Sequence, residues 1–210
     1  DAATVFLYST LLSNGAATDG ANVWMSGPST ILFISDSSVY SGDATGLGGG
    51  VYCANGGTVL LESGRIGDNT ATSGGGLYLD DCLFNSFAGS TVDAVCPTGG
   101  SGVVCNVAAS TGGGIYATNG SSVNLIGSAD APATVAENDA DEGGGLYLTG
   151  AGTTADATDA WFVDNQGSFE GGAIYARAGA SFTMDIADPD CRGSRCSLMR
   201  NNFSAIAGGV

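Results

Sequence analysis

A motif of glycines followed by an aliphatic residue and a tyrosine recurs along this chain. Four copies carry three glycines before the aliphatic residue, and the fifth reads Gly171-Gly172-Ala173-Ile174-Tyr175. The tyrosines of the five copies are Tyr52, Tyr78, Tyr116, Tyr147 and Tyr175. Their separations of 26, 38, 31 and 28 residues are typical of solenoids and other repeat arrays. In such folds each unit buries its apolar surface against the next unit.

Two further elements accompany this motif. An asparagine stands five or six residues before the glycines at Asn69, Asn138, Asn165 and Asn202. Asn106 occupies a less regular copy, and Asp43 replaces the asparagine in the segment from Tyr40. A third element follows the tyrosine, as in Gly56-Gly57-Thr58-Val59-Leu60-Leu61. Each repeat therefore contains three short alternating runs of apolar residues that are separated by Gly and Asn turns.

These patterns predict an all-β chain folded as a right-handed parallel β-helix, or solenoid, of about six to seven coils. No window shows helical periodicity over ten or more residues. Short strands also occur in hairpin meanders, but the same residues recur at the same place in each unit, which favours coils stacked in register. Side chains alternate along a strand, so the aliphatic residue before each tyrosine should face the core and the tyrosine should point outward. The recurrent asparagines should stack in turns and bond the neighbouring coil.

The repeats divide the chain into two regions. Residues 1–35 are less regular, and we expect an irregular N-terminal coil or cap there. Residues 36–210 should form one continuous solenoid domain with two inserted loops. One insertion lies around residues 80–102 and the other around residues 185–196.

The segment Phe162-Val163-Asp164-Asn165, paired with Gly171-Gly172-Ala173-Ile174, resembles a known repeat. It is similar to the FxxN and GGA-aliphatic repeats of chlamydial polymorphic outer membrane proteins and related β-helix surface proteins. The resemblance covers roughly residues 36–210, with Ile, Val or Met replacing Phe and Gly replacing Ala in other copies. It implies a surface-exposed, adhesin-like β-helix.

Six cysteines indicate disulfides and an oxidising, extracellular or cell-surface location. Cys191 and Cys196 stand five residues apart in a loop segment and are predicted to pair. Cys96 with Cys105, and Cys53 with Cys82 on successive coils, are the further predicted pairs. Six cysteines allow 15 connectivities, and free buried thiols are the alternative, notably for Cys53.

The charge is strongly acidic, with 21 Asp and Glu against five Arg and a formal net charge of −16. Such a surface repels nucleic acid and acidic polysaccharides, whereas neutral glycans and cations stay compatible. Acidic residues cluster at Asp80-Asp81, at residues 139–142 and at residues 185–190, but none matches a known calcium loop. We therefore expect solvated acidic loops without a metal or cofactor, although calcium remains compatible with them. No apolar run is long enough for a membrane-spanning helix.

The five outward-pointing tyrosines of successive coils should form a ladder, and this tyrosine ladder has two possible roles. Its rings could stack on sugars or pack against a partner, or they could reinforce the sheet by stacking on one another. Two N-glycosylation sequons begin at Asn119 and Asn202.

The chain contains no Lys or His, and no carboxylate pair stands out from the repeat, so we do not expect an enzyme. The predicted function is a structural or adhesive surface β-helix. Because residues 207–210 begin a further copy of the motif, it could also be a subunit of an end-to-end filament. The alternative is a glycan hydrolase that uses carboxylates.

Overall fold

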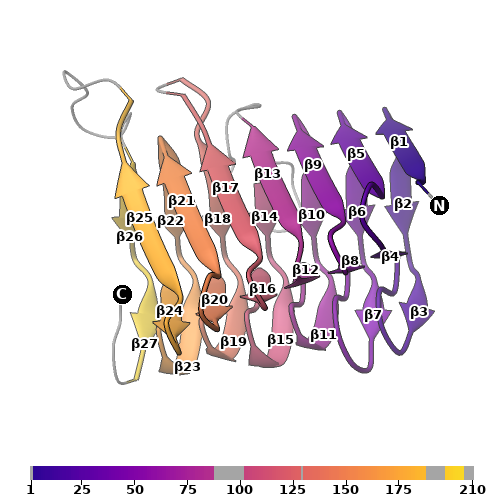
Figure 1. The fold of residues 1–210 in the computed structure, drawn as a ribbon. Coiled ribbons are helices and arrows are strands. Elements are labelled where there is room, and N and C mark those ends of the chain that lie inside the picture. Colours follow the sequence, from indigo (N-terminus) through magenta and orange to yellow (C-terminus); the bar gives the residue numbers. More distant parts are fainter. Residues whose placement is uncertain (1, 88–101, 129, 188–196, 206–210) are drawn as a thin grey trace.

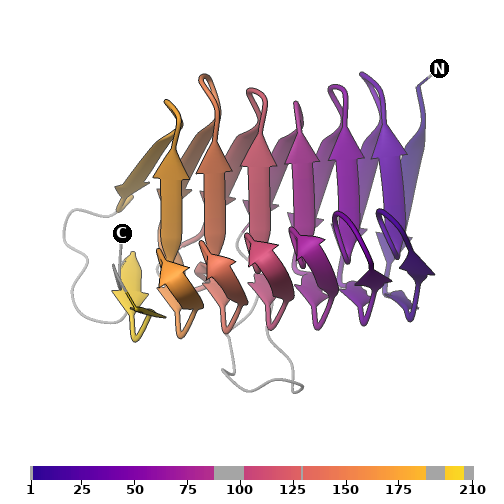
Figure 2. The same ribbon diagram turned by 90° about the horizontal axis from the view of Figure 1, so that it is seen from below.

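The computed structural model describes residues 2–87, 102–128, 130–187 and 197–205. Every regular element among them is a β-strand, and the strands form four parallel sheets that wrap around one core (Figure 1). The chain passes through sheets A, B, C and D in turn, and each strand pairs with the equivalent strand of the next coil (Figure 2). The predicted parallel β-helix is therefore confirmed.

Three sheets hold seven strands each and the fourth holds six. Sheet A consists of β1 (Thr4–Tyr8), β5 (Ile31–Ser35), β9 (Thr58–Glu62), β13 (Leu83–Phe87), β17 (Ser122–Ile126), β21 (Thr154–Thr158) and β25 (Ser181–Asp185). Sheet B consists of β2 (Leu11–Ser13), β6 (Ser38–Tyr40), β10 (Arg65–Gly67), β14 (Gly102–Val104), β18 (Ala133–Ala136), β22 (Ala160–Val163) and β26 (Leu198–Arg200). Sheet C consists of β3 (Ala16–Ala17), β7 (Asp43–Ala44), β11 (Thr70–Ser73), β15 (Val107–Thr111), β19 (Asp139–Glu142), β23 (Gln166–Glu170) and β27 (Phe203–Ser204). Sheet D consists of β4 (Val23–Ser26), β8 (Val51–Ala54), β12 (Leu77–Asp80), β16 (Ile115–Thr118), β20 (Leu146–Thr149) and β24 (Ile174–Arg177).

The described residues thus form six complete coils and three strands of a seventh. The first coil, β1 to β4, lies within residues 1–35, where we expected an irregular coil or cap. Its strands keep the register of the later coils, because Val23 pairs with Val51 and Val5 with Leu32. Strand β5, which ends at residue 35, already belongs to the second coil. The solenoid therefore continues across the boundary that the sequence suggested.

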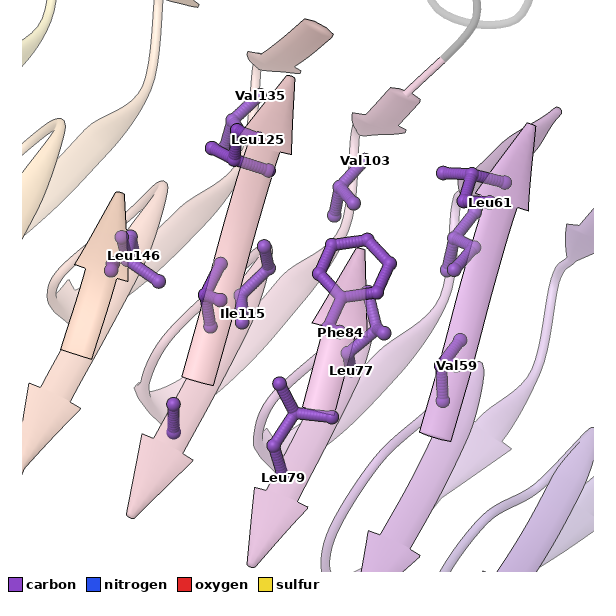
Figure 3. Close-up of a cluster of buried hydrophobic side chains, with 14 of the residues drawn as sticks. Val59, Leu61, Leu77, Leu79, Phe84, Val103, Ile115, Leu125, Val135 and Leu146 are labelled. Carbon is purple, nitrogen blue, oxygen red and sulfur yellow. The ribbon is translucent and has the colours of Figure 1, made fainter. Parts of the chain in front are cut away.

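The core lies between the four sheets and runs the length of the rod. The aliphatic residues before the ladder tyrosines, including Leu77, Ile115 and Leu146, are fully buried, as predicted from strand alternation. Figure 3 shows these side chains pointing into the same interior as Phe84 and Leu125 of sheet A. Each coil hides its apolar side chains only by stacking on its neighbours, as expected for a solenoid.

The glycines of the repeat have two different roles. The first glycine of each cluster adopts a left-handed conformation, with φ of +65 at Gly48 and +64 at Gly112. This conformation favours glycine and turns the chain from sheet C into sheet D. The second glycine is required for space, because a Cβ on Gly113 would lie 2.4 Å from the carbonyl oxygen of Asp139 in the next coil.

Three details of the predicted repeat change. Each complete coil holds four strands, and not three, because the residues between the asparagine and the glycines form the strands of sheet C. Asp43 pairs with Thr70, so Gly42, and not Asp43, occupies the place of the recurrent asparagine. Asp43 is exposed, and its carboxylate accepts a hydrogen bond of 2.8 Å from the Thr70 hydroxyl. The insertion predicted around residues 80–102 is shorter than expected, because Leu83–Phe87 is the regular strand β13. Residues 88–101 and 188–196, where both inserted loops fall, lie outside the described residues.

Candidate functional site

The predicted tyrosine ladder is present on the outer face of sheet D. Tyr52, Tyr78 and Tyr116 lie in register on consecutive strands. Their ring centroids are 5.5 Å apart for the first pair and 4.7 Å for the second, with interplanar angles of 5° and 4°. The Tyr116 ring stacks on the Tyr147 ring with centroids 5.0 Å apart. The Tyr175 ring is tilted by 47° relative to the Tyr147 ring, and their centroids are 5.4 Å apart.

Trp24 adds a rung that the sequence analysis missed. It pairs with Tyr52 in register, and the two aromatic systems are parallel within 8° at 6.1 Å. The motif was not recognised here because Gly20-Ala21-Asn22 replaces the three glycines and tryptophan replaces tyrosine. The available signal was Gly20, which has the positive φ (+60) of the first glycine in the later clusters.

Tyr147 is not an exposed ring as the sequence suggested. Only 1% of its surface is accessible, whereas Trp24 at the first rung is 62% exposed. The guanidinium of Arg177 lies over the Tyr147 ring, 5.4 Å from its centroid, and makes a cation–π contact. The fifth rung is therefore closed to solvent.

The stacking geometry limits what this ladder can bind. Because the ring planes face one another between rungs, most ring faces are covered by the neighbouring tyrosine. Solvent then meets the ring edges and hydroxyl groups, whereas a sugar that stacks needs an open ring face. The geometry favours the reading in which the ladder reinforces the sheet.

Burial changes the acidity of the ladder phenols. It raises the pKa of Tyr78 and Tyr116, and it raises the pKa of Tyr147 to about 12 despite the opposing effect of Arg177. The ordinary value is 10.0. The neutral phenol of Tyr147 therefore stabilises the fold fully below pH 10, and this contribution is lost as the pH rises from 10 towards 12.

We therefore expect the free energy of unfolding to fall between pH 10 and about 12, as Tyr147 ionises. Ultraviolet absorbance of phenolate, recorded with circular dichroism, should show a group of tyrosines that ionises only near alkaline unfolding. The variant Tyr147→Phe is the control, and it should lack the phenolate absorbance that one tyrosine contributes at high pH. Complete phenolate formation at pH 10 in the folded protein would contradict the expectation.

The recurrent asparagines form a second ladder inside the turn between sheets B and C. Asn69, Asn106, Asn138 and Asn165 are fully buried. The Nδ2 of Asn69 donates to Oδ1 of Asn106 at 2.9 Å, and Nδ2 of Asn106 donates to Oδ1 of Asn138 at 3.0 Å. In the same way, Nδ2 of Asn138 donates to Oδ1 of Asn165, and Nδ2 of Asn165 donates to Oδ1 of Asn202, both at 2.9 Å. The predicted stacking of these amides is confirmed.

Asn22 extends this ladder from a different place in the repeat. Gly42 leaves room beside Asn69, and Nδ2 of Asn22 donates to Oδ1 of Asn69 at 3.1 Å. A Cβ on Gly42 would lie 2.6 Å from Nδ2 of Asn22. An amide from the turn before β4 thus replaces the one that the second coil lacks.

The structure tests only part of the predicted cysteine pairing. Cys53 and Cys82 form a disulfide between the second and third coils, within the buried core cluster. Cys105 is disulfide-bonded, whereas its predicted partner Cys96 lies outside the described residues. The predicted pair Cys191–Cys196 also lies outside the described residues.

The two sequons differ in accessibility. Asn119 is exposed in the turn between β16 and β17, and its Nδ2 donates to the Asp80 carboxylate, at 2.7 Å. Asn202 belongs to the asparagine ladder, where its Nδ2 donates to the carbonyl oxygen of Phe162 at 2.9 Å. A glycan on Asn202 would disturb the hydrogen bonds that its amide makes at the end of the asparagine ladder, so Asn119 is the better acceptor.

Carboxylates line the turn between sheets C and D. Glu142 and Glu170 lie in register on adjacent coils, and the Tyr175 hydroxyl donates to Glu170, which raises the pKa of that phenol. Burial and the neighbouring Asp141 raise the pKa of Asp139. In the part of the chain that the structure describes, no group of three or more His, Cys, Asp or Glu side chains could hold a metal ion.

Arg65 is a buried cation on the outer face of sheet B. Its guanidinium lies over the Tyr40 ring, 5.3 Å from the centroid, and its Nη2 is 3.8 Å from the Asp68 carboxylate. The side chain covers Gly67, where a Cβ would lie 2.5 Å from Nε of Arg65. This packing gives Arg65 a structural role at the surface of the third coil.

Comparisons with known protein families, curated proteins and solved structures find no match. None of the helix criteria for a membrane span is met within the described residues. The arguments for function therefore rest on the geometry of this chain.

Proposed function

We propose that this chain is a structural and adhesive β-helix of an extracellular or cell-surface protein. The observation that carries the proposal is that the residues defining the repeat bind one another. The asparagine amides bond from coil to coil, and the tyrosine rings stack from coil to coil. These contacts between coils stabilise a rod. Surface side chains of successive coils are therefore held at a fixed spacing of about 4.8 Å.

Two features support the location. The disulfide between Cys53 and Cys82 is buried in the core, and structural disulfides persist in oxidising compartments. The resemblance of the repeat to the FxxN and GGA-aliphatic motifs of surface proteins favours the same placement. Antibodies against the chain should label the outside of intact cells that express it, or material that those cells release. Labelling confined to the cell interior would contradict the proposal.

End-to-end stacking is the form of assembly that the coil edges favour. Core-facing side chains are covered in the middle coils, but Val5 of β1 is 50% exposed. Phe182 and Met184 of β25 are only partly buried at the opposite end of the rod. A second copy placed in the register of consecutive coils would cover these side chains and pair the open strand edges.

Electron microscopy of the purified chain tests this assembly. Filaments many times longer than one rod, about 30 Å for seven coils, would support it. The variants Leu7→Asp and Met184→Asp place a charge in the core-facing row of the first and last sheet A strands and should abolish filaments. Thr183→Asp is the matched control, because Thr183 is the outward-facing neighbour on β25. Single short rods at all concentrations would contradict end-to-end stacking.

A second candidate, a carboxylate-based glycan hydrolase, is favoured by Glu142 and Glu170 alone. Adjacent strands lie about 4.8 Å apart, and the carboxyl groups of retaining glycosidases lie about 5–5.5 Å apart. Release of reducing sugars from neutral polysaccharides, lost in both Glu142→Gln and Glu170→Gln, would establish this activity and contradict a purely structural role. Equal release by these variants and the parent would assign the activity to a contaminant.

A further inference from the structure

The outer face of sheet A is apolar over the first four coils. Strand alternation points Phe6, Phe33 and Leu60 outward, in register on β1, β5 and β9. Tyr8, Ile31 and Leu83 flank this row on the same face. We call these six residues the side face. Phe6 and Tyr8 are each 59% exposed, although they are aromatic.

The side face is nearly free of charge on a strongly acidic chain. Among the outward positions of β1, β5, β9 and β13 the only ionisable acid or base is Glu62, apart from the Tyr8 phenol. The Glu62 carboxylate accepts a hydrogen bond of 3.3 Å from the Ser35 hydroxyl at the rim of this face. The same face becomes acidic farther along the rod, at Asp156 of β21 and Asp185 of β25. Within sheet A, the charge-poor surface thus ends before β21.

Ring contacts hold the side face in one shape. The Phe33 ring packs against Phe6 with centroids 6.0 Å apart and against Tyr8 with centroids 5.6 Å apart. The Phe6 and Tyr8 rings are parallel within 9°. Because the aromatic side chains already contact one another, little additional side-chain entropy is lost when a partner covers them.

We propose that the side face is a side-by-side contact between two copies of this chain. The argument is electrostatic. Each copy carries a net charge of −16, so two copies repel each other wherever their acidic faces meet. A two-fold contact places the same residues opposite one another, and an uncharged apolar face permits this without opposing like charges. Two flat sheets can pack at a separation of about 10 Å.

The size of the side face sets the strength of this contact. Four strands about 4.8 Å apart and five residues long, at about 3.3 Å per residue, present roughly 300 Å² of flat face. Stable complexes bury about 800 Å² on each partner. We therefore expect a reversible contact with a Kd on the order of 1 mM. Such a contact would join rods laterally once they are concentrated on a surface or in filaments, so the inference deepens the proposed structural role.

Sedimentation of the 210-residue chain between about 0.05 and 1 mM tests the proposal. End-to-end stacking would add to the mass, so the chain carries Leu7→Asp; its weight-average mass should rise with concentration from that of one chain, about 20.6 kDa, towards that of a dimer. The variants Phe33→Asp and Leu60→Asp each place a carboxylate in the central row, and like-charge contacts should weaken the association at least about tenfold. Thr183→Asp adds the same charge to the same sheet outside the side face and should associate like the parent.

Salt provides a second measurement. Raising the salt concentration from about 0.02 to 0.5 M screens the repulsion between the acidic copies and should strengthen an apolar side-by-side contact. A contact between opposite charges would weaken instead. Circular dichroism melting confirms that each variant is folded before its mass is interpreted.

Two outcomes would overturn the proposal. A parent chain that stays monomeric to 1 mM at high salt has no such contact. Association that persists when Phe33→Asp or Leu60→Asp is added to the folded Leu7→Asp chain uses another surface. If Leu7→Asp or Met184→Asp abolished association while Phe33→Asp and Leu60→Asp alone did not, the coil ends would be that surface. The end-to-end and side-by-side contacts can therefore fail separately.

Discussion

Replacing Asn106 with alanine should lower the free energy of unfolding by about 3–5 kcal/mol. Oδ1 of Asn106 accepts from the backbone N–H of Asn69 at 3.1 Å and from its Nδ2 at 2.9 Å. Nδ2 of Asn106 donates to Oδ1 of Asn138 and to the carbonyl oxygen of Ile66, both at 3.0 Å. The substitution leaves several of these buried groups unpaired, and each unpaired group costs about 1–3 kcal/mol. Urea unfolding followed by circular dichroism measures the loss.

Asn124→Ala is the matched control for this substitution. Asn124 also forms an amide pair across coils, donating to Oδ1 of Asn85 at 2.7 Å, but the pair lies on the outer face of sheet A. Water can replace the lost partner there, so the expected cost is about 0.5–1 kcal/mol. Equal costs for the two alanine variants would show that the buried ladder contributes no more than an ordinary surface hydrogen bond.

Gly113→Ala should destabilise the fold by at least about 3 kcal/mol. A Cβ at this position would lie 2.4 Å from the carbonyl oxygen of Asp139 and 2.5 Å from that of Gly144. Both atoms belong to the backbone of the next coil, so the clash cannot be relieved by rotating a side chain. The coils would have to separate, and the hydrogen bonds around the turn would lengthen. Thermal unfolding, compared with the parent, measures the effect.

Gly120→Ala separates this steric effect from the conformational cost of losing a glycine. Gly120 has a φ of +83, but no atom lies within 4 Å of a Cβ placed there. Only backbone strain opposes alanine at this position, at about 1 kcal/mol. If Gly113→Ala proved as mild as Gly120→Ala, adjacent coils would have to be less closely packed than the structure shows.

The sequence predicted the architecture because the repeat places the same residue in the same environment in each coil. Leu77, Ile115 and Leu146 recur at one core position, so their burial followed from strand alternation. The asparagine ladder was predictable for the same reason. The disulfide between Cys53 and Cys82 was predicted from their places on successive coils, and it is confirmed.

The features that sequence reasoning missed depend on contacts between different places in the repeat. Asn22 enters the asparagine ladder from the turn before β4, and only the space beside Gly42 explains why. Arg177 covers Tyr147 from the neighbouring coil, which no alignment of tyrosines reveals. The side face was missed because its residues share a sheet but no common motif. Phe6, Phe33 and Leu60 align only when the strand register is known.

The hydrogen bonds of the asparagine ladder all point the same way. From Asn22 to Asn202, Nδ2 of each amide donates to Oδ1 of the next one towards the C-terminal coil. Flipping a single amide, so that its Oδ1 and Nδ2 exchange places, would bring two donors together on one side of it and two acceptors together on the other. The orientation is therefore set collectively, and the row of aligned amide dipoles makes the two ends of the rod chemically different. A coil added to either end could join this row only with its own amide in the same sense, so head-to-head joining would break the chain of bonds.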